Sequence, residues 1–454
     1  MGLLAAALLI FPIYSHLVAV VELCRHGART PTHFIKPWDN YTIWPQGPGE
    51  LIPEGMRQHY LIGTELRRRY MFETQLLLPN YFQPEIRVFS SDVNRTLMSA
   101  ESQIQGLYPA GTGPLLRSQL METVATPPID ISDLSALNQS LGMSALPNLT
   151  QVIPIHSDEE IRQYALDAGD VCGYYSDMID YKSQPSAELD SIFNEFSDVI
   201  QTIMQQMNYT EAKARSSQSS ILDSLTSNLF VNNPFPLGFN QSFYDRGIIL
   251  KNRLKNFYQF EPDIMARFSG TPLLNLILQD LLNVIAGNVT QKFFLYSAHD
   301  TTIMCALSFL LLNHTKNPPF ASVMLFELHE YNQEYFVNII YNDVLQNVSS
   351  CGGYNCSIYN FQRFIQVRSI PDYYNTCNLA FNSYNSSKLL NAKSDEFHWP
   401  GHDNTVNLHW YFWLSLGFYI AFGAVICLFA VLSTRLLKKK NSNTTEESMI
   451  TIRN

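Results

Sequence analysis

The chain has no excess of basic residues and few charged residues of any kind. Its 30 lysines and arginines stand against 40 aspartates and glutamates, so the formal net charge is -10, and charged residues make up only 15% of the total. An acidic chain offers no extended basic surface for a phosphate backbone, which argues against nucleic acid as a partner. The 46% of hydrophobic residues exclude a disordered chain and allow a large core with a membrane contribution.

Cysteine is also scarce, and no Cys-X-X-Cys pair or histidine-rich spacing indicates a metal site. Of the seven cysteines, Cys24, Cys305 and Cys427 lie in apolar stretches. The other four lie in turn-rich or polar segments that suit disulfides: Cys172, Cys351, Cys356 and Cys377. We therefore expect disulfides and no metal.

Both ends of the chain carry uncharged apolar stretches. Residues 1–15 have the length of a signal-peptide core, although the usual basic residue near the start is missing, so a buried first strand of a cytosolic protein is the alternative. Residues 410–432 are long enough to cross a bilayer as a helix, and the basic cluster at 435–440 matches a cytoplasmic stop-transfer signal. These features predict a single-pass type I membrane protein whose bulk is lumenal or extracellular.

Dense glycosylation acceptors agree with this orientation. Asn-X-Ser/Thr sequences before residue 410 occur at Asn40, Asn138, Asn148, Asn208, Asn240, Asn288, Asn313, Asn347, Asn355 and Asn385. A further acceptor, Asn94, precedes Arg95 on a segment that we expect to be helical. Because such a helix would bury much of Asn94, we expect this acceptor to stay unmodified.

The first buried strand ends in a turn that carries several candidate catalytic and anion-binding residues. Residues 16–23 form a near-continuous apolar run, as in a strand buried on both faces, and Cys24-Arg25-His26-Gly27-Ala28-Arg29-Thr30-Pro31 follows. Arg25 and Arg29 bring two forked, permanently charged donors that suit a tetrahedral dianion, and His26 between them is a candidate nucleophile. Ligands usually bind at the carboxyl ends of strands in α/β sheets.

Two later segments repeat this arrangement. Residues 86–89 read as a short strand followed by Ser90-Ser91-Asp92, which places Arg95 at the start of the next helix. Residues 293–296 read as another buried strand, followed by His299 and Asp300. If the three strands are parallel neighbours, their ends meet at one edge of the sheet, where Asp300 is a candidate proton donor.

These motifs resemble those of the histidine acid phosphatases, the family of lysosomal and prostatic acid phosphatases, phytases and lysophosphatidic acid phosphatase. The resemblance spans about residues 17–377 and rests on four blocks. The first is Arg25 to Pro31, and the second is Pro53-Glu54-Gly55 with Gln58, Gly63, Leu66, Arg67, Arg69 and Tyr70. The third is Ser90 to Asp92 with Arg95, Thr96, Ser99 and Ala100, and the fourth is Ser297 to Thr302. It implies an acid phosphatase acting on phosphate monoesters.

The family mechanism assigns a role to each matched residue. The resemblance implies that His26 attacks phosphorus and forms a phosphohistidine, and that Asp300 protonates the leaving alcohol and then activates water. It places four further side chains on the phosphoryl oxygens: Arg25, Arg29, Arg95 and His299. It requires no cofactor. It also pairs Cys172 with Cys377 and Cys351 with Cys356.

The rest of the chain fits an α/β fold with a central, mostly parallel sheet flanked by helices, as in histidine phosphatases, and a smaller helical insertion. We expect Ser186 to cap a helix, a helix over 273–286 that starts at Thr271-Pro272 and stops at Gly287, and strands over 321–328 and 335–341. The expected order is 1–15 signal peptide, 16–130 catalytic domain, first part, 131–250 helical insertion, 251–380 catalytic domain, second part, 381–409 stalk, 410–432 transmembrane helix and 433–454 cytoplasmic tail.

Substrate and partners are less readable. Thr301-Thr302 resembles animal-type acid phosphatases, whereas Ala28 and Thr30 resemble the phytase form of the first motif, so a phytase-like inositol phosphate phosphatase is an alternative. A catalytically silent receptor or adhesion ectodomain on the same fold is another. We expect a small phosphate monoester or a phosphoprotein as substrate and a lysosome-like compartment or the cell surface as location, and we leave a homodimer open.

Overall fold

The computed structural model describes residues 15–118, 122–157, 164–313 and 315–379. The chain divides into two compact units, residues 1–391 and 392–454, and every described residue belongs to the first. The predicted stalk, transmembrane helix and tail, and all of the predicted signal peptide but Ser15, lie outside the described residues. No helix of the described part has both the length and the hydropathy to cross a membrane.

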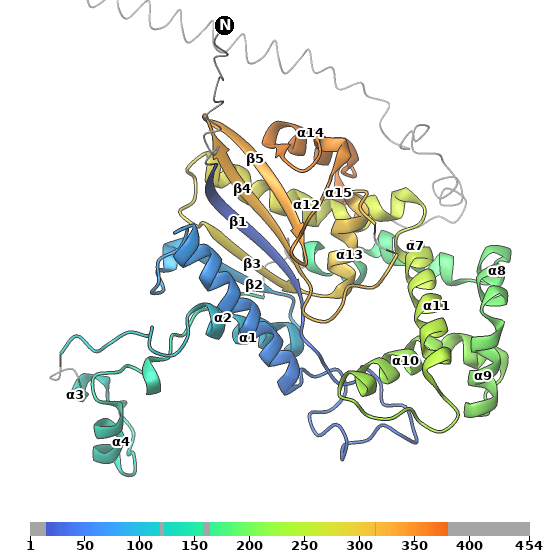
Figure 1. Cartoon of the computed structure of the whole chain (residues 1–454), viewed down its shortest axis with the longest axis horizontal. Helices are drawn as coiled ribbons and strands as arrows, with labels where there is room; N and C mark the ends of the chain where they lie inside the picture. Colours follow the sequence, from blue (N-terminus) through green and yellow to red (C-terminus); the bar gives the residue numbers. More distant parts are fainter. Residues whose placement is uncertain (1–14, 119–121, 158–163, 314, 380–454) are drawn as a thin grey trace, which may run out of the picture. The chain divides into compact units, whose positions relative to one another are not determined.

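A seven-stranded sheet forms the centre of the described unit (Figure 1). The strands are β1 (His16–Arg25), β2 (Ile86–Ser90), β3 (Phe293–Ala298), β4 (Val323–Tyr331), β5 (Glu334–Tyr341), β6 (Val344–Leu345) and β7 (Cys356–Ser357). Their order is β2-β3-β1-β4-β5-β6, with β7 paired to β5. The apolar runs of the sequence therefore become the strands that they predict.

The prediction of a mostly parallel sheet is wrong, because the sheet is mixed. Only β2–β3 and β3–β1 pair in parallel, whereas β4, β5, β6 and β7 all pair antiparallel. For the pairs β4–β5 and β5–β6 the reason lies in the short turns. Asn332 and Gln333 join β4 to β5, Asn342 and Asp343 join β5 to β6, and all four have positive φ. Two-residue turns of this kind permit only an antiparallel hairpin.

Helices cover both faces of the sheet. On one face pack α1 (Pro53–Arg67) and α2 (Asn94–Leu107), whose Leu66 and Ile104 share a core with Val20 and Leu295. On the other face pack α12 (Asp263–Ile285), α13 (Asp300–Phe309) and α14 (Ile358–Arg368). Neighbouring strand residues alternate between the two cores, as the period of a strand dictates.

The segment between β2 and β3 is helical. After α2, its α-helices in the described ranges are α3 (Glu122–Ala125), α4 (Leu134–Leu141), α6 (Ala168–Val171), α7 (Gly173–Ser183), α8 (Ala187–Glu195), α9 (Ser197–Met207), α10 (Glu211–Phe230) and α11 (Gln241–Gln259), followed by α12. Helices α8 to α11 share a core of their own that includes Leu189, Ile203 and Leu250. Ser186 caps α8 as expected, since its side chain accepts from Leu189 N.

The predicted start of the helix before β3 is wrong. Helix α12 begins at Asp263, and Pro272 lies inside it rather than in its first turn. The correct start signal is Pro262 followed by an acidic first turn that begins with Asp263. Asp263 lies eight residues before Thr271. Thr271 does not cap the helix; its hydroxyl donates to Arg267 O and accepts from Ile370 N. The stop at Gly287, with φ of 67°, is confirmed.

Both disulfides implied by the resemblance are present. Cys172 joins Cys377 and ties the helical segment to α15 (Tyr373–Cys377), and Cys351 joins Cys356 across a short loop. Cys24 and Cys305 carry free thiols.

The prediction that a helix would bury Asn94 is wrong: α2 begins at Asn94, and its side chain is exposed and donates to Glu50 Oε1. The buried positions of α2 include Thr96, Ser99 and Gln103, and Asn94 lies about 200° around the helix from Thr96. Burial therefore gives no reason to expect that this acceptor stays empty.

Candidate active site

The ends of three parallel strands bring the predicted site residues together. Arg25 pairs in register with Ala298, and Ser90 with Ser297. One residue beyond these last register pairs, His26 N donates to Ala298 O at 2.9 Å and Ser91 N donates to Ser297 O at 3.0 Å. The segments of His26, Ser91 and His299 therefore meet at one edge of the sheet, as the sequence predicts.

The turn after β1 is held by close packing against the start of α1. A Cβ atom added to Gly27 would lie 2.4 Å from Gly55 O, and one added to Gly55 would lie 2.2 Å from Ala28 O. No side chain fits at either position, so the two glycines allow backbone to lie against backbone. Gln58 Oε1 accepts from Ala28 N at 2.9 Å, and Ser99 Oγ accepts from Gly27 N at 3.0 Å.

His26 is buried and has the form that a nucleophile needs. Its Nδ1 lies 2.8 Å from Gly27 O; because a carbonyl only accepts, Nδ1 carries the proton and Nε2 keeps its lone pair. Burial, followed by the charges of Arg25, Arg29 and Arg95, holds the pKa of His26 well below its ordinary value of 6.5. The imidazole is therefore neutral and nucleophilic even in acidic solution.

Three arginines surround this imidazole with unused hydrogen-bond donors. The Nε atoms of Arg25, Arg29 and Arg95 are buried and have no hydrogen-bond partner within the described ranges. The Nε atoms of Arg215 and Arg368 are also buried without a partner, but only Arg25, Arg29 and Arg95 act with their charges on His26, so these three donors are available to an anion next to it. Arg25 also lies over the ring of Phe320, with its guanidinium carbon 4.3 Å from the ring centroid.

Arg29 is fixed by a residue that the sequence did not single out. Asp223 on α10 accepts from both Nη atoms of Arg29, at 3.0 and 2.9 Å, and from Thr32 N and Oγ1. Burial alone would raise the pKa of Asp223, but the charges of Arg29 and Lys251 lower it below its ordinary range. Asp223 is therefore an ionised carboxylate that orients Arg29.

His299 and Asp300 lie where the last strand meets α13. His299 is the residue before the helix, and its Nε2 lies 2.9 Å from Ser91 Oγ. Burial and the charge of Arg95 lower the pKa of His299 to about 4. The rings of His299 and His26 have centroids 5.8 Å apart, so His299 lies beside the imidazole of His26.

Asp300 is surrounded by groups that donate to it. Lys255 Nζ lies 2.9 Å from Oδ2, Asn317 Nδ2 donates to the same oxygen at 2.6 Å, and Arg25 Nη2 lies 3.8 Å from it. Lys255 and Asn317, like Asp223, were missed in the sequence. Each is distant along the chain from its partner, and no local pattern distinguishes Lys255 from a solvated helix residue.

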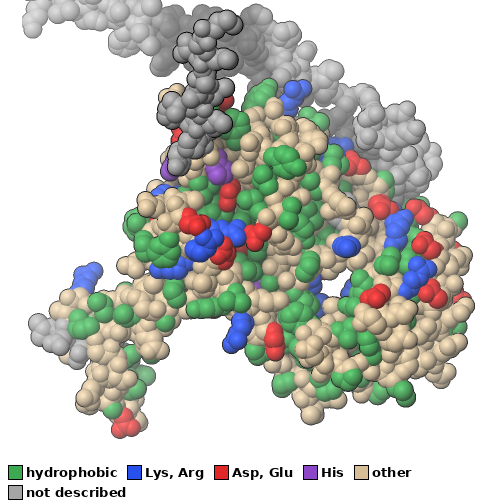
Figure 2. All heavy atoms as spheres, in the orientation of Figure 1, with side chains coloured by type: hydrophobic (Ala, Val, Ile, Leu, Met, Phe, Trp, Pro, Cys, Tyr) green, Lys and Arg blue, Asp and Glu red, His purple; other side chains and the backbone are tan. Residues whose placement is uncertain are grey.

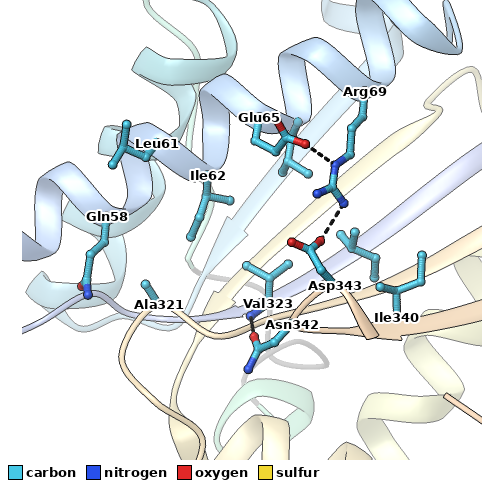
Figure 3. A pocket seen from close by; sticks show the side chains of 12 residues that line it. Gln58, Leu61, Ile62, Glu65, Arg69, Ala321, Val323, Ile340, Asn342 and Asp343 are labelled. Atoms are coloured by element: carbon cyan, nitrogen blue, oxygen red, sulfur yellow. Dashed lines mark hydrogen bonds and ion pairs between the residues drawn. The ribbon is translucent and has the colours of Figure 1, made fainter. Parts of the chain in front are cut away.

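A separate pocket of about 380 Å³ lies between α1 and strands β4 and β5 (Figure 3). Side chains of α1 face Val323, Ile340 and Asn342 across it, and Arg69 bridges Glu65 and Asp343 at one end. None of the predicted site residues lines this pocket. Of its lining residues, Gln58 accepts from Ala28 N and Ala321 N donates to His26 O, so the pocket lies beside the cluster of predicted site residues and not within it.

The face in Figure 2 carries both signs of charge. Basic and acidic side chains are intermingled on it. This face therefore offers no extended basic area.

Comparison with known proteins matches residues 16–342 to a family described as the histidine phosphatase superfamily, branch 2. A putative acid phosphatase 5 of Caenorhabditis elegans is 28% identical over 313 residues, covering 68% of this chain and 65% of that protein. The chain thus spans just under two thirds of that relative. Lysosomal acid phosphatase of Xenopus laevis is 28% identical over 380 residues, covering 79% and 78%.

Two solved structures share the fold. The apo phytase of Hafnia alvei superposes with a TM-score of 0.57 at 17% identity, covering 82% of this chain and 100% of that one. The phytase of Citrobacter braakii superposes with a TM-score of 0.55 at 16% identity, covering 79% and 99%. At such low identity these likenesses concern the fold alone.

Proposed function

The chain belongs to the histidine phosphatase superfamily, branch 2, and from this premise we propose that it is an acid phosphatase that hydrolyses phosphate monoesters through His26. The observation that carries this proposal is a buried imidazole, held through Nδ1 to Gly27 O, beside three arginines whose buried Nε donors have no acceptor in the described part of the chain. A phosphoryl group satisfies those donors and places phosphorus in front of the imidazole. Acid phosphatase relatives and the family match support the same activity.

The first step transfers the phosphoryl group to the enzyme. Nε2 of His26 attacks phosphorus, the bond from phosphorus to the ester oxygen breaks, and Asp300 gives its proton to the departing oxygen. Arg25, Arg29 and Arg95 neutralise the phosphoryl oxygens, and Asp223 keeps Arg29 in place. His299 lies beside the same oxygens, oriented by Ser91.

The second step releases phosphate. Water attacks phosphorus of the phosphohistidine, the nitrogen–phosphorus bond breaks, and Asp300, now a carboxylate, takes a proton from the water. The products are an alcohol and inorganic phosphate, and His26 returns to its neutral form. Both steps use only residues of this chain, the ester and water.

Trapping of the intermediate tests this mechanism. Enzyme mixed with a ³²P-labelled aryl phosphate and quenched in alkali, where phosphohistidine survives, should carry label on the peptide that contains His26. His26→Ala should abolish both label and turnover. Label on another residue, or steady turnover by His26→Ala, would exclude His26 as the nucleophile.

The substrate class is tested by a panel. Aryl phosphates, sugar phosphates, inositol hexakisphosphate and lysophosphatidate should be compared by kcat/KM between pH 4 and 8. We propose a broad monoesterase; a preference of more than about tenfold for inositol hexakisphosphate would favour the phytase-like alternative, which Ala28 and Thr30 suggest. Absence of hydrolysis on the whole panel would favour a silent ectodomain.

We also propose that a membrane helix anchors a lumenal or extracellular catalytic unit. Residues 410–432 are uncharged and precede a basic cluster, and two disulfides in the described unit suit an oxidising compartment. In sealed vesicles, an epitope after residue 440 should be digested by added protease, while the catalytic unit stays protected and sensitive to glycosidase only after detergent. Protection of both would contradict this topology.

A further inference from the structure

Lys255, Asn317 and Asp300 form a closed ring of hydrogen bonds at the edge of the site. Lys255 Nζ lies 2.9 Å from Asp300 Oδ2 and donates to Asn317 Oδ1 at 2.9 Å, while Asn317 Nδ2 donates to Asp300 Oδ2 at 2.6 Å. The three residues come from α11, the loop after α13, and the first turn of α13. Lys255 and Asp300 are largely buried, with side chains 18% and 21% exposed. An ion pair in this setting is only weakly screened by solvent.

The ring is organised around an ionised carboxylate. Besides Lys255 and Asn317, Thr301 N donates to Oδ1 of Asp300 at 3.0 Å, and Arg25 Nη2 approaches Oδ2. Lys255, Asn317 and Thr301 are hydrogen-bond donors that need an accepting oxygen, and Arg25 adds a positive charge without a hydrogen bond. Yet the proposed reaction needs Asp300 with a proton to give, so the surroundings of Asp300 decide when that proton is present.

Charged groups face Asp300 from several elements. Arg25 at the end of β1, Arg95 on α2, and Lys251 and Lys255 on α11 are cationic, and His299 is the adjacent residue. The anionic Asp223 on α10 pairs with Arg29 and Lys251. Burial by itself raises the pKa of Asp300, but the charges of Lys255 and Arg25 and the hydrogen bonds of Lys255 and Asn317 hold it well below its ordinary value. Lys255 is the nearest cation.

We propose that Lys255 and Asn317 are positioning residues for the proton donor: they fix Oδ2 of Asp300, and the charge of Lys255 sets the highest pH at which Asp300 carries its proton. This inference rests on the proposed role of Asp300. A bound phosphoryl dianion favours protonation of Asp300, and Lys255 opposes it. Once the proton has passed to the ester oxygen, Lys255 stabilises the carboxylate that remains.

Removal of the ammonium group gives a test with a defined sign. Without Lys255 the pKa of Asp300 rises, so its protonated form persists to higher pH, and the alkaline limb of kcat/KM should move upward. In the full-length enzyme, Lys255→Met should shift this limb by about one pH unit, the usual effect of one close charge. Glycerol 3-phosphate is the substrate of choice, because an alkoxide leaving group depends fully on the donor.

Helix α11 offers a matched control. Lys251 lies one turn before Lys255; its Nζ pairs with Asp223 at 3.5 Å and its charge also acts on Asp300, whereas Lys255 Nζ pairs with Asp300 directly at 2.9 Å. Lys251→Met removes the same charge from the same helix and should shift the limb by less than half as much. Lys255→Arg keeps the charge and should stay within about 0.3 pH units of the wild type. Lys213→Met, at an exposed position of α10, should change neither rate nor profile.

Folding defects do not remove the test. If Lys255→Met fails to fold, Asn317→Ala deletes one donor to Oδ2 and should still move the limb upward by a smaller amount. An unmoved limb in Lys255→Met, a downward shift, or an equal shift in Lys251→Met would overturn the inference. So would an unmoved limb in Asn317→Ala when the lysine variant is lost. An inactive wild type, or an active His26→Ala, would instead refute the proposed function.

Discussion

The backbone N–H of His26 donates to the carbonyl of Ala298 at 2.9 Å, one residue beyond the last register pair of β1 and β3. This bond fixes the imidazole against the segment that carries His299 and Asp300. Two motifs that lie more than 270 residues apart in the sequence thus meet at the same end of two paired strands. The site is built from backbone geometry first and from side chains second.

The role of Asp300 predicts a dependence on the leaving group. Asp300→Asn should lower kcat/KM for alkyl phosphates by about 10² to 10⁴, because these need a proton, and should affect aryl phosphates with acidic leaving groups much less. Rates for a series of aryl and alkyl phosphates measure this. Asp223→Asn is the control: it acts through Arg29 and should slow all esters alike. Equal loss on all esters in Asp300→Asn would remove Asp300 as donor.

Arg95 should hold phosphate as well as the transition state. Arg95→Ala removes a buried charged donor, so the inhibition constant of inorganic phosphate should rise about tenfold or more, along with a loss of turnover. Competitive inhibition of aryl phosphate hydrolysis measures the constant. Arg57→Ala, at an exposed position of α1, should leave both unchanged. Unaltered phosphate inhibition in Arg95→Ala would place Arg95 outside the pocket.

The contact of Gly27 with Gly55 should not tolerate a methyl group. In Gly55→Ala the new Cβ would lie 2.2 Å from Ala28 O, so the turn or the helix must move. Overpacking of this kind costs about 1–3 kcal/mol, and we expect a lower melting temperature together with weaker phosphate binding. Gly169→Ala in α6 meets no atom within 4 Å and should be neutral. Normal phosphate binding in Gly55→Ala would show that this packing does not position the turn.

Sequence patterns predicted the parts of the site that depend on local order. A buried apolar run becomes a strand wherever it lies, and parallel neighbours align their ends, so the segments of His26, Arg95 and Asp300 could be placed at one edge of the sheet, whereas the roles of these residues came from the family resemblance. The mixed sheet could have been recognised too, because Asn332-Gln333 and Asn342-Asp343 are hairpin turns. Similarly, the spacing of buried residues on α2 would have placed Asn94 on the solvent side.

The helical contributions could not be predicted in this way. Asp223 lies 194 residues from Arg29, and Lys255 lies on a helix whose pattern indicates only core and surface. Which turn of α11 reaches Asp300 depends on how the helices pack against the sheet edge. That packing is tertiary, and no period in the sequence encodes it.

A buried row of hydrogen-bonded side chains behind the site, formed by Glu22, Gln103 and His59, must hold one extra proton. Gln103 Nε2 donates to both oxygens of Glu22, Gln103 Oε1 faces His59 Nδ1 at 2.9 Å, and His59 Nε2 faces Arg25 O at 3.0 Å. Both oxygens near His59, Gln103 Oε1 and Arg25 O, can only accept, so the ring of His59 must carry two protons in this arrangement. The alternative is that the amide of Gln103 is turned by 180°, so that its nitrogen donates to His59 and a protonated Glu22 donates to its oxygen. Burial lowers the pKa of His59 and raises that of Glu22 to about 8, so Glu22 holds the proton.

This assignment predicts that stability falls as the pH rises from about 4.5 to about 8. The pKa of Glu22 is about 8 when folded and 4.5 ordinarily, so its contribution is complete below about pH 4.5 and is lost as the pH rises to 8. Glu22→Gln mimics the protonated form and should remove most of this loss, which is on the order of a few kcal/mol. Urea midpoints at pH 5 and pH 8 measure it. Glu54→Gln, exposed on α1, should follow the wild type. Parallel pH dependence of Glu22→Gln and wild type would mean that Glu22 stays ionised in the fold.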